Sequence, residues 1–190
     1  MESQKKIYFA SDQHFGAPTN ELSFPREQKF VAWLDEIKKD AEIIFLVGDL
    51  FDFWFEYKTV VPKGFVRILG KLAEIRDSGI EIHFFVGNHD LRMNDYFQKE
   101  LNIPVYFDNK EFTFNNKTFL IGHGDGKGPG DLGYKRMKKV FTNPFSKWLF
   151  GWLHPDIGVR LAQYFSVKNK LISGDADVNY LGEDKEWHKL

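Results

Sequence analysis

Four short apolar runs in this chain each lead directly into aspartate, asparagine or histidine, and this pattern constrains the fold more than any other feature. The runs are residues 6–10 (KIYFA), 43–47 (IIFLV), 82–86 (IHFFV) and 118–121 (TFLI). The polar residues that follow them are Asp12 and His14, Asp49 and Asp52, Asn88, His89 and Asp90, and His123 and Asp125. Uninterrupted apolar runs of this length are typical of strands buried on both faces of a sheet. Carboxylates beside such strands are costly to desolvate, so a positive charge is expected near them.

The segments between these runs predict helices. Apolar residues recur at helical spacing in Leu22–Lys39 and in Lys63–Ser78, which Gly79 closes. Further strands are predicted at Pro104–Phe107, Glu111–Phe114 and Lys117–Ile121, with a turn at Asn115-Asn116 between the last two. Alternating strands and helices followed by clustered strands predict a layered α/β fold. With 190 residues and no internal repeat or linker, the chain is expected to form a single domain, residues 1–190.

Composition excludes several classes of protein. Hydrophobic residues make up 43% and aromatic residues 17%, which argues against disorder, and the net charge of −1 carries no nucleic-acid signature. The absence of cysteine excludes disulfides, thiolate metal ligands and cysteine nucleophiles. No apolar run approaches the ~18 residues that a membrane-spanning helix needs, and the start MESQKKIYFA has no secretory signal pattern. The protein is therefore expected in the cytoplasm, either free or peripheral on the inner face of the cell membrane.

The residue types at the four strand ends predict a metal site. Ligand sites in open α/β sheets lie outside the carboxyl ends of the strands, so these side chains are expected to converge. Carboxylate, amide and imidazole ligands without sulfur suit Mn²⁺, Fe²⁺ or Zn²⁺ better than Ca²⁺. One carboxylate can bridge two ions, so Asp49 is predicted as the bridge, with Asp52 beside the ligands. Each motif alone is more often a turn or a helix cap, but the four together favour a metal site.

These motifs resemble the calcineurin-like metallophosphoesterase superfamily, whose pattern runs D-x-H, G-D-x-x-D, G-N-H-[D/E], G-H and finally G-H-x-H. The resemblance implies a four-layer α/β/β/α sandwich and two divalent ions, with Mn²⁺ as the expected metal. It implies metal ligation by Asp12, His14, Asp49, Asn88 and His123. It also implies that His89 acts as an acid or supports the phosphoryl oxygens together with Asn88, and that Asp52 orients His89. A histidine held by a carboxylate suits proton donation to a leaving oxygen.

Within that superfamily the chain looks most like the UDP-2,3-diacylglucosamine pyrophosphohydrolases of lipid A synthesis. The resemblance rests on the short first loop, GDLFDFW, HGD with Asp131 and Tyr134 after it, and the basic aromatic segment that follows. It implies hydrolysis of the diphosphate bond of UDP-2,3-diacylglucosamine to 2,3-diacylglucosamine 1-phosphate and UMP. The substrate contacts that it implies are Asp131, Tyr134, Lys168 and Lys170.

The basic aromatic segment predicts a helical cap at residues 131–170. Tyr134–Lys170 contains eight Lys or Arg against one acid, Asp156, and an aromatic residue recurs every three or four positions. Asn143-Pro144 predicts the start of a helix within it. Such a stripe is often core that covers a sheet edge, but the likeness also favours a slot for acyl chains and contact with an anionic membrane surface. Nucleic acid is not the expected partner, although a basic aromatic composition suits both nucleic acid and an anionic lipid surface.

The chain departs from the family pattern in two places. Some members of the lipid A branch carry Arg where this chain has His89, which leaves a related phosphoesterase of nucleotides or nucleic-acid diesters as an alternative. The G-H-x-H motif is absent, so the chain is expected to lack the C-terminal strands of the sandwich, and His188 is not expected to replace that motif. A non-catalytic form that only binds lipid is therefore the second alternative. His83 and His154 are expected to be structural or exposed, and Asp90 and Asp125 to orient their neighbours.

Overall fold

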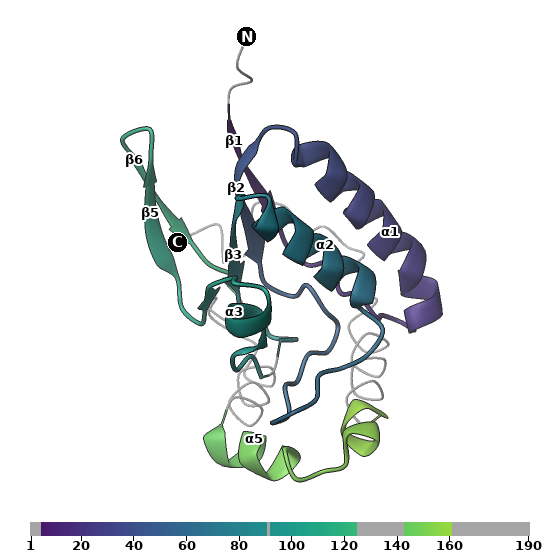
Figure 1. Ribbon diagram of the computed structural model, residues 1–190. Coiled ribbons are helices and arrows are strands. Elements are labelled where there is room, and N and C mark those ends of the chain that lie inside the picture. Colours follow the sequence, from purple (N-terminus) through teal and green to yellow (C-terminus); the bar gives the residue numbers. More distant parts are fainter. Residues whose placement is uncertain (1–4, 91, 125–142, 161–190) are drawn as a thin grey trace, which may run out of the picture. The chain divides into compact units, whose positions relative to one another are not determined.

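The computed structural model describes residues 5–90, 92–124 and 143–160 (Figure 1). Contacts divide the chain into two compact units, residues 1–123 and 124–190, and each is considered by itself.

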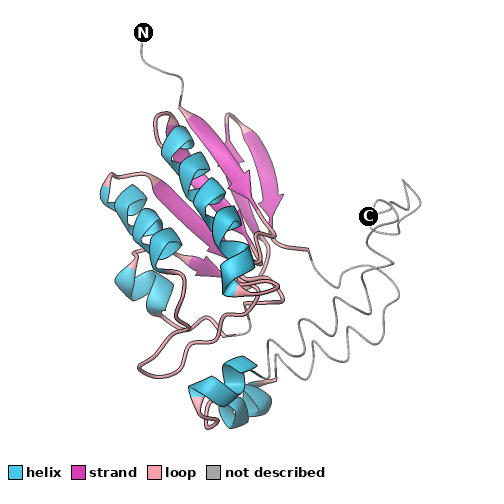
Figure 2. Cartoon of the chain, turned by 90° about the vertical axis from the view of Figure 1, so that its right-hand side faces the viewer, coloured by secondary structure: helices cyan, strands magenta, loops and turns pink. Residues whose placement is uncertain are grey.

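The first unit is built on a parallel sheet. Its strands, in spatial order, are β1 (Lys6–Ala10), β2 (Ala41–Val47), β3 (Glu81–Phe85) and β4 (Val105–Tyr106). The helices between them are α1 (Asn20–Ile37), α2 (Val66–Asp77) and α3 (Tyr96–Glu100). Figures 1 and 2 show α1 and α2 side by side on one face of the sheet, and a β-hairpin on the other face. The predicted α/β class with a parallel sheet is therefore confirmed, while the complete four-layer sandwich stays a prediction.

Alternation along β2 separates two apolar layers. Ile44 and Leu46 belong to the large core under α1 and α2, whereas Phe45 between them belongs to a smaller cluster on the hairpin side. In β3, Phe84 and Phe85 divide in the same way. Because successive side chains of a strand point to opposite faces, an uninterrupted apolar run fills both layers.

The hairpin forms a second, antiparallel sheet of β5 (Lys110–Phe114) and β6 (Lys117–Ile121). Its turn residues, Asn115 and Asn116, have φ values of +50° and +61°, the left-handed conformation that asparagine tolerates, so the predicted turn is confirmed. The predicted cluster of three strands is divided, because the short strand β4 pairs with β3 in the parallel sheet.

Helix boundaries differ slightly from the predictions. Helix α2 begins at Val66 rather than Lys63, since Gly64 has a φ of +108° that is incompatible with a helix. The residue before it, Phe65, offers no side-chain cap, and the carboxylate of Glu27 in α1 accepts the N–H of Ile68 instead, at 3.1 Å. Helix α3 has only five residues and was not predicted.

In the second unit the structure describes residues 143–160, with helix α5 at Pro144–Phe150. Asn143 Oδ1 accepts the N–H of Phe145 at 2.8 Å, which confirms the predicted helix start. Phe145, Trp148 and Trp152 form a ring-to-ring series and are 56–76% exposed. None of the helices in the described ranges is long and apolar enough to cross a membrane.

Candidate metal centre

The candidate centre lies where the loops after β1, β2, β3 and β6 meet. The loops after β1 and β2 are joined through their backbones, because Asp12 N donates to Gly48 O at 3.1 Å and His14 N to Asp49 O at 2.9 Å. The predicted convergence of distant strand ends is thus observed for the first unit.

Three of the predicted ligands have an unusual backbone conformation. Asp12, His14 and Asp49 have φ values of +58°, +47° and +53°, in the left-handed region that few non-glycine residues adopt. Such conformations persist only where the surroundings impose them, and they are concentrated at functional sites. Here one restraint comes from α1, where Arg26 Nη2 donates to the carbonyl oxygens of His14 at 2.7 Å and Ala17 at 2.8 Å.

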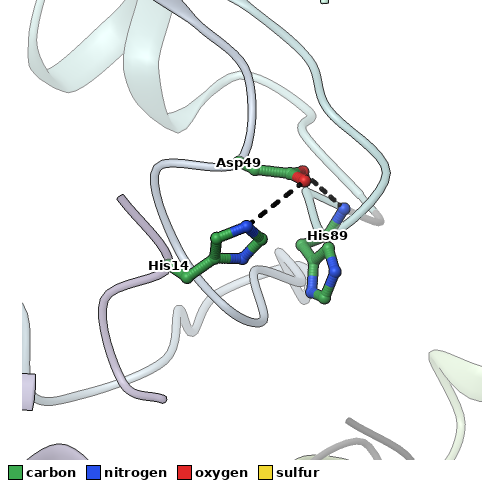
Figure 3. Close-up of side chains that lie close together, drawn as sticks. All are labelled: His14, Asp49 and His89. Atoms are coloured by element: carbon green, nitrogen blue, oxygen red, sulfur yellow. Dashed lines mark hydrogen bonds and ion pairs between the residues drawn. The ribbon is translucent and has the colours of Figure 1, made fainter. Parts of the chain in front are cut away.

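Asp49 is the shared member of two groups of possible metal ligands. The groups are His14, Asp49 and His89, and Asp12, Asp49 and His123; in each, one ligand atom per residue lies within 4.8 Å of the others. Figure 3 shows His14 and His89 beside the Asp49 carboxylate. Asp49 Oδ1 accepts the backbone N–H of His89 at 2.8 Å, and Oδ2 lies 3.8 Å from His14 Nε2. This buried carboxylate is therefore the point at which the two candidate groups meet.

His123 approaches the same carboxylate oxygen of Asp49 as His14 does. Its Nδ1–H donates to Val47 O at 2.9 Å, and its Nε2 lies 3.3 Å from Asp49 Oδ2 and 3.4 Å from Asn88 Oδ1. Metal-binding histidines commonly donate their second ring N–H to a carbonyl in this way. The structure therefore brings His123 and Asn88 together, as the sequence predicted.

The surroundings of Asp49 and His123 favour the charged form of both side chains. Burial raises the pKa of Asp49, but the hydrogen bond to His123, the charge of His89 and the His89 backbone N–H outweigh it, and the pKa falls below its ordinary value. Burial lowers the pKa of His123, yet the hydrogen bond and charge of Asp49 raise it to about 9. A cation bound between these residues would take the place of the His123 proton.

Asp52 lies between two imidazoles. Its Oδ1 is 3.7 Å from His14 Nδ1 and 3.7 Å from His89 Nδ1. The closer contact to His89 uses the backbone, since Nδ1–H donates to Asp52 O at 2.8 Å. Asp52 therefore contacts His89 as predicted, but the hydrogen bond that orients the ring comes from its carbonyl group.

Close packing surrounds the Asp49 carboxylate. A Cβ atom at Gly87 would lie 2.2 Å from Asp49 Oδ1, and one at Gly48 would lie 2.4 Å from His123 Nδ1. Asp90 Oδ2 accepts the N–H groups of Gly87 and Asp49, each at 3.0 Å, which confirms the orienting role predicted for Asp90. Burial raises the pKa of Asp90 to about 7.

The donor set fits a divalent transition metal. Carboxylate, amide oxygen and imidazole nitrogen converge without sulfur among the described residues, and Gly48 and Gly87 let His123 and Asp49 lie close to the backbone. The residues that would hold the metal are Asp12, His14, Asp49, Asn88 and His123.

The structure does not describe all of the predicted site residues. Asp131, Tyr134, Lys168 and Lys170, together with Asp125 and His188, fall outside the described residues. His83 stacks on Phe45 at 5.0 Å and is structural, as predicted, while His154 is exposed. Two residues that hydrogen-bond to the loops of the site were not predicted from the sequence, Arg26 and Glu56. For Glu56, the available signal was an acidic residue within the aromatic run LFDFWFE.

A family model described as calcineurin-like phosphoesterase matches residues 5–170, and the chain belongs to this family. The family is enzymatic and metal-dependent, in agreement with the ligand set described above.

Three relatives are each named UDP-2,3-diacylglucosamine hydrolase. The protein from Porphyromonas gingivalis is 41% identical over 88% of this chain and 64% of its own length. The protein from Haemophilus influenzae is 26% identical over 87% and 68%, and that from Histophilus somni is 24% identical over 96% and 76%. This chain thus spans slightly less than two thirds of the Porphyromonas gingivalis relative.

Proposed function

We propose that this chain belongs to a hydrolase that cleaves the diphosphate bond of UDP-2,3-diacylglucosamine, releasing UMP and 2,3-diacylglucosamine 1-phosphate. The observation that supports the reaction type is the position of Asp49, which belongs to both groups of candidate metal ligands at the meeting point of four loops. The substrate is supported by the name that the relatives share, including one that is 41% identical.

The proposed centre holds two divalent ions, with Mn²⁺ as the preferred metal. By the family pattern, Asp12 and His14 would bind one ion, Asn88 and His123 the other, and Asp49 both. Two such ions lower the pKa of a water molecule and neutralise charge on phosphoryl oxygens.

The chain's own residues would then orient the substrate and supply a proton. His89 donates its Nδ1–H to Asp52 O, which leaves Nε2 to carry the proton for the leaving oxygen when the ring is protonated. The amide N–H₂ of Asn88 would donate to a phosphoryl oxygen as charge develops on it.

Residues 131–170 are proposed as a cap within a single domain of 1–190. The exposed rings of Phe145, Trp148 and Trp152 offer an apolar surface of the kind that acyl chains need. Asp131, Tyr134, Lys168 and Lys170 are proposed as substrate contacts. An anionic membrane surface is proposed as a second partner, which would place the protein in the cytoplasm and peripheral on the inner face of the membrane.

A direct comparison of substrates tests the proposal. Purified protein with Mn²⁺ is assayed on UDP-2,3-diacylglucosamine and on a soluble phosphodiester, with Asp49→Ala as the inactive control. The proposal predicts release of UMP from the lipid substrate, and its loss in Asp49→Ala. Hydrolysis of the soluble diester alone would contradict the substrate, and wild-type turnover by Asp49→Ala would contradict the mechanism.

A further inference from the structure

One buried carboxylate near the centre has no part in the proposed mechanism. Glu56 is 2% exposed and follows the loop that carries Asp49 and Asp52. Burying an ionised carboxylate is costly unless hydrogen bonds replace its water, so its partners show what it does.

Every partner of the Glu56 side chain among the described residues is a hydrogen-bond donor. Glu56 Oε1 accepts the indole N–H of Trp54 at 3.1 Å. Oε2 accepts the backbone N–H groups of Asn94, Asp95 and Tyr96, at 2.7, 2.9 and 3.3 Å. Three of these four donors lie in the segment after β3, almost 40 residues further along the chain. Glu56 therefore ties the loop after β2 to the loop after β3.

These two loops also run alongside each other between Glu56 and the metal ligands. Trp54 N donates to His89 O at 3.2 Å, Arg92 N to Trp54 O at 3.3 Å, and Glu56 N to Arg92 O at 3.0 Å. At the other end of this ladder, His89 donates from its backbone N to Asp49 Oδ1 and from Nδ1 to Asp52 O. The ladder thus begins at the ligands and ends at the Glu56 carboxylate.

We propose that Glu56 is a positioning residue that locks these two loops together and so fixes His89 and Asn88 relative to Asp49. The inference rests on the proposed metal-dependent function. A carboxylate is needed, because both of its oxygens accept. Glutamine would have to turn its N–H₂ group toward either the Trp54 indole N–H or the backbone N–H groups, where donor would face donor.

Glu56→Gln tests this inference, and the chain offers a matched control. Glu27 is also buried, at 4% exposure, and caps a helix through Ile68 N, yet no described contact joins it to the loops after β2 and β3. Glu27→Gln therefore repeats the chemical change at a buried cap outside the ladder. All proteins are compared well below their unfolding temperatures.

Two measurements distinguish a positioning role of Glu56 from an effect on the stability of the protein alone. The first is the tautomer of the His89 ring in metal-free protein, measured by long-range ¹H–¹⁵N NMR at about pH 8.5, above the ordinary pKa of histidine, and assigned with His89→Gln. The second is the dissociation constant of Mn²⁺ by calorimetry. Wild type and Glu27→Gln are expected to keep the Nδ1–H tautomer and equal Mn²⁺ affinity. Glu56→Gln is expected to populate both tautomers and to bind Mn²⁺ about tenfold more weakly.

The outcomes distinguish the possible failures. A Glu56→Gln protein with wild-type His89 signals and Mn²⁺ affinity, and only a lower unfolding temperature, would overturn the inference. If Glu56→Gln does not fold, Trp54→Phe removes one donor and is expected to shift the His89 signals in the same direction by less; unchanged signals would overturn it. If wild type binds no Mn²⁺, the proposed function fails, while the tautomer of His89 still decides the role of Glu56.

Discussion

Two regions that share strand β2 are built in different ways. At its carboxyl end, Asp49 is held by directional hydrogen bonds and three ligands keep left-handed backbone conformations. Midway along the strand, Phe45 packs among rings, with centroids of Phe9, His83 and Phe112 at 4.9–5.0 Å. In the first region, hydrogen bonds hold the Asp49 carboxylate in one position, but the backbone there is strained. In the second region, burial of the aromatic rings stabilises the fold. The difference implies that stability and metal binding can be changed separately.

The largest expected effect on stability comes from the aromatic layer. Phe45→Ala removes a fully buried ring and is expected to lower the free energy of unfolding by about 3–5 kcal/mol. Mn²⁺ affinity measured in the folded protein should stay unchanged. Phe119→Ala is the control, since that ring is 43% exposed, and should cost less than about 1 kcal/mol. Loss of metal affinity in folded Phe45→Ala would show that the two regions are coupled.

A substitution beside Asp49 should affect metal binding more strongly than stability. Gly87→Ala places a Cβ atom against Asp49 Oδ1, which must move. The expected result is a loss of Mn²⁺ affinity of about tenfold or more, with a stability cost of about 1–3 kcal/mol. Gly70→Ala serves as the control because nothing lies within 4 Å of its added Cβ, and it should stabilise α2 by about 0.5–1 kcal/mol. Unchanged metal binding in Gly87→Ala would place the centre elsewhere.

The smallest expected effect is the pH dependence of the aromatic layer. Burial lowers the pKa of His83 in the folded protein, although Glu81 opposes the shift. The unfolded chain therefore binds a proton first, so the contribution of His83 to stability is present above about pH 6.5 and is lost as the pH falls through the folded pKa. Tyr106, Lys110 and Arg76 are the other polar groups facing this ring. Denaturant unfolding between about pH 5 and 8 should show a weaker pH dependence in His83→Gln than in wild type; equal slopes would assign the dependence to other groups.

The features that could be predicted from the sequence are those encoded locally. Uninterrupted apolar runs located β1, β2 and β3, and the Asn115-Asn116 turn located the hairpin. The ligand candidates could be recognised because polar residues directly follow these strands. Asp12, His14, Asp49 and His123 do converge, although their roles at the metal stay predictions.

The features that were missed depend on contacts between distant segments. Helix α2 takes its N-terminal hydrogen bond from Glu27, 41 positions earlier, so its start could not be read from the adjacent residues. Helix α3 begins at backbone N–H groups that bind Glu56, which precedes it by about 40 positions. Strand β4 is only two residues long, and its place in the parallel sheet is set by β3. The residues adjacent in the sequence do not predict such tertiary contacts.

The metal content of the protein is the measurement that tests the central claim most directly. Wild type and Asp49→Asn are loaded with Mn²⁺, dialysed exhaustively and analysed by mass spectrometry for metal per chain. We expect wild type to retain about two ions, since Asp49 can bridge them, and Asp49→Asn to lose at least one. Wild type that retains one ion or none, or an Asp49→Asn protein that retains as much as wild type, would contradict the two-ion centre at Asp49.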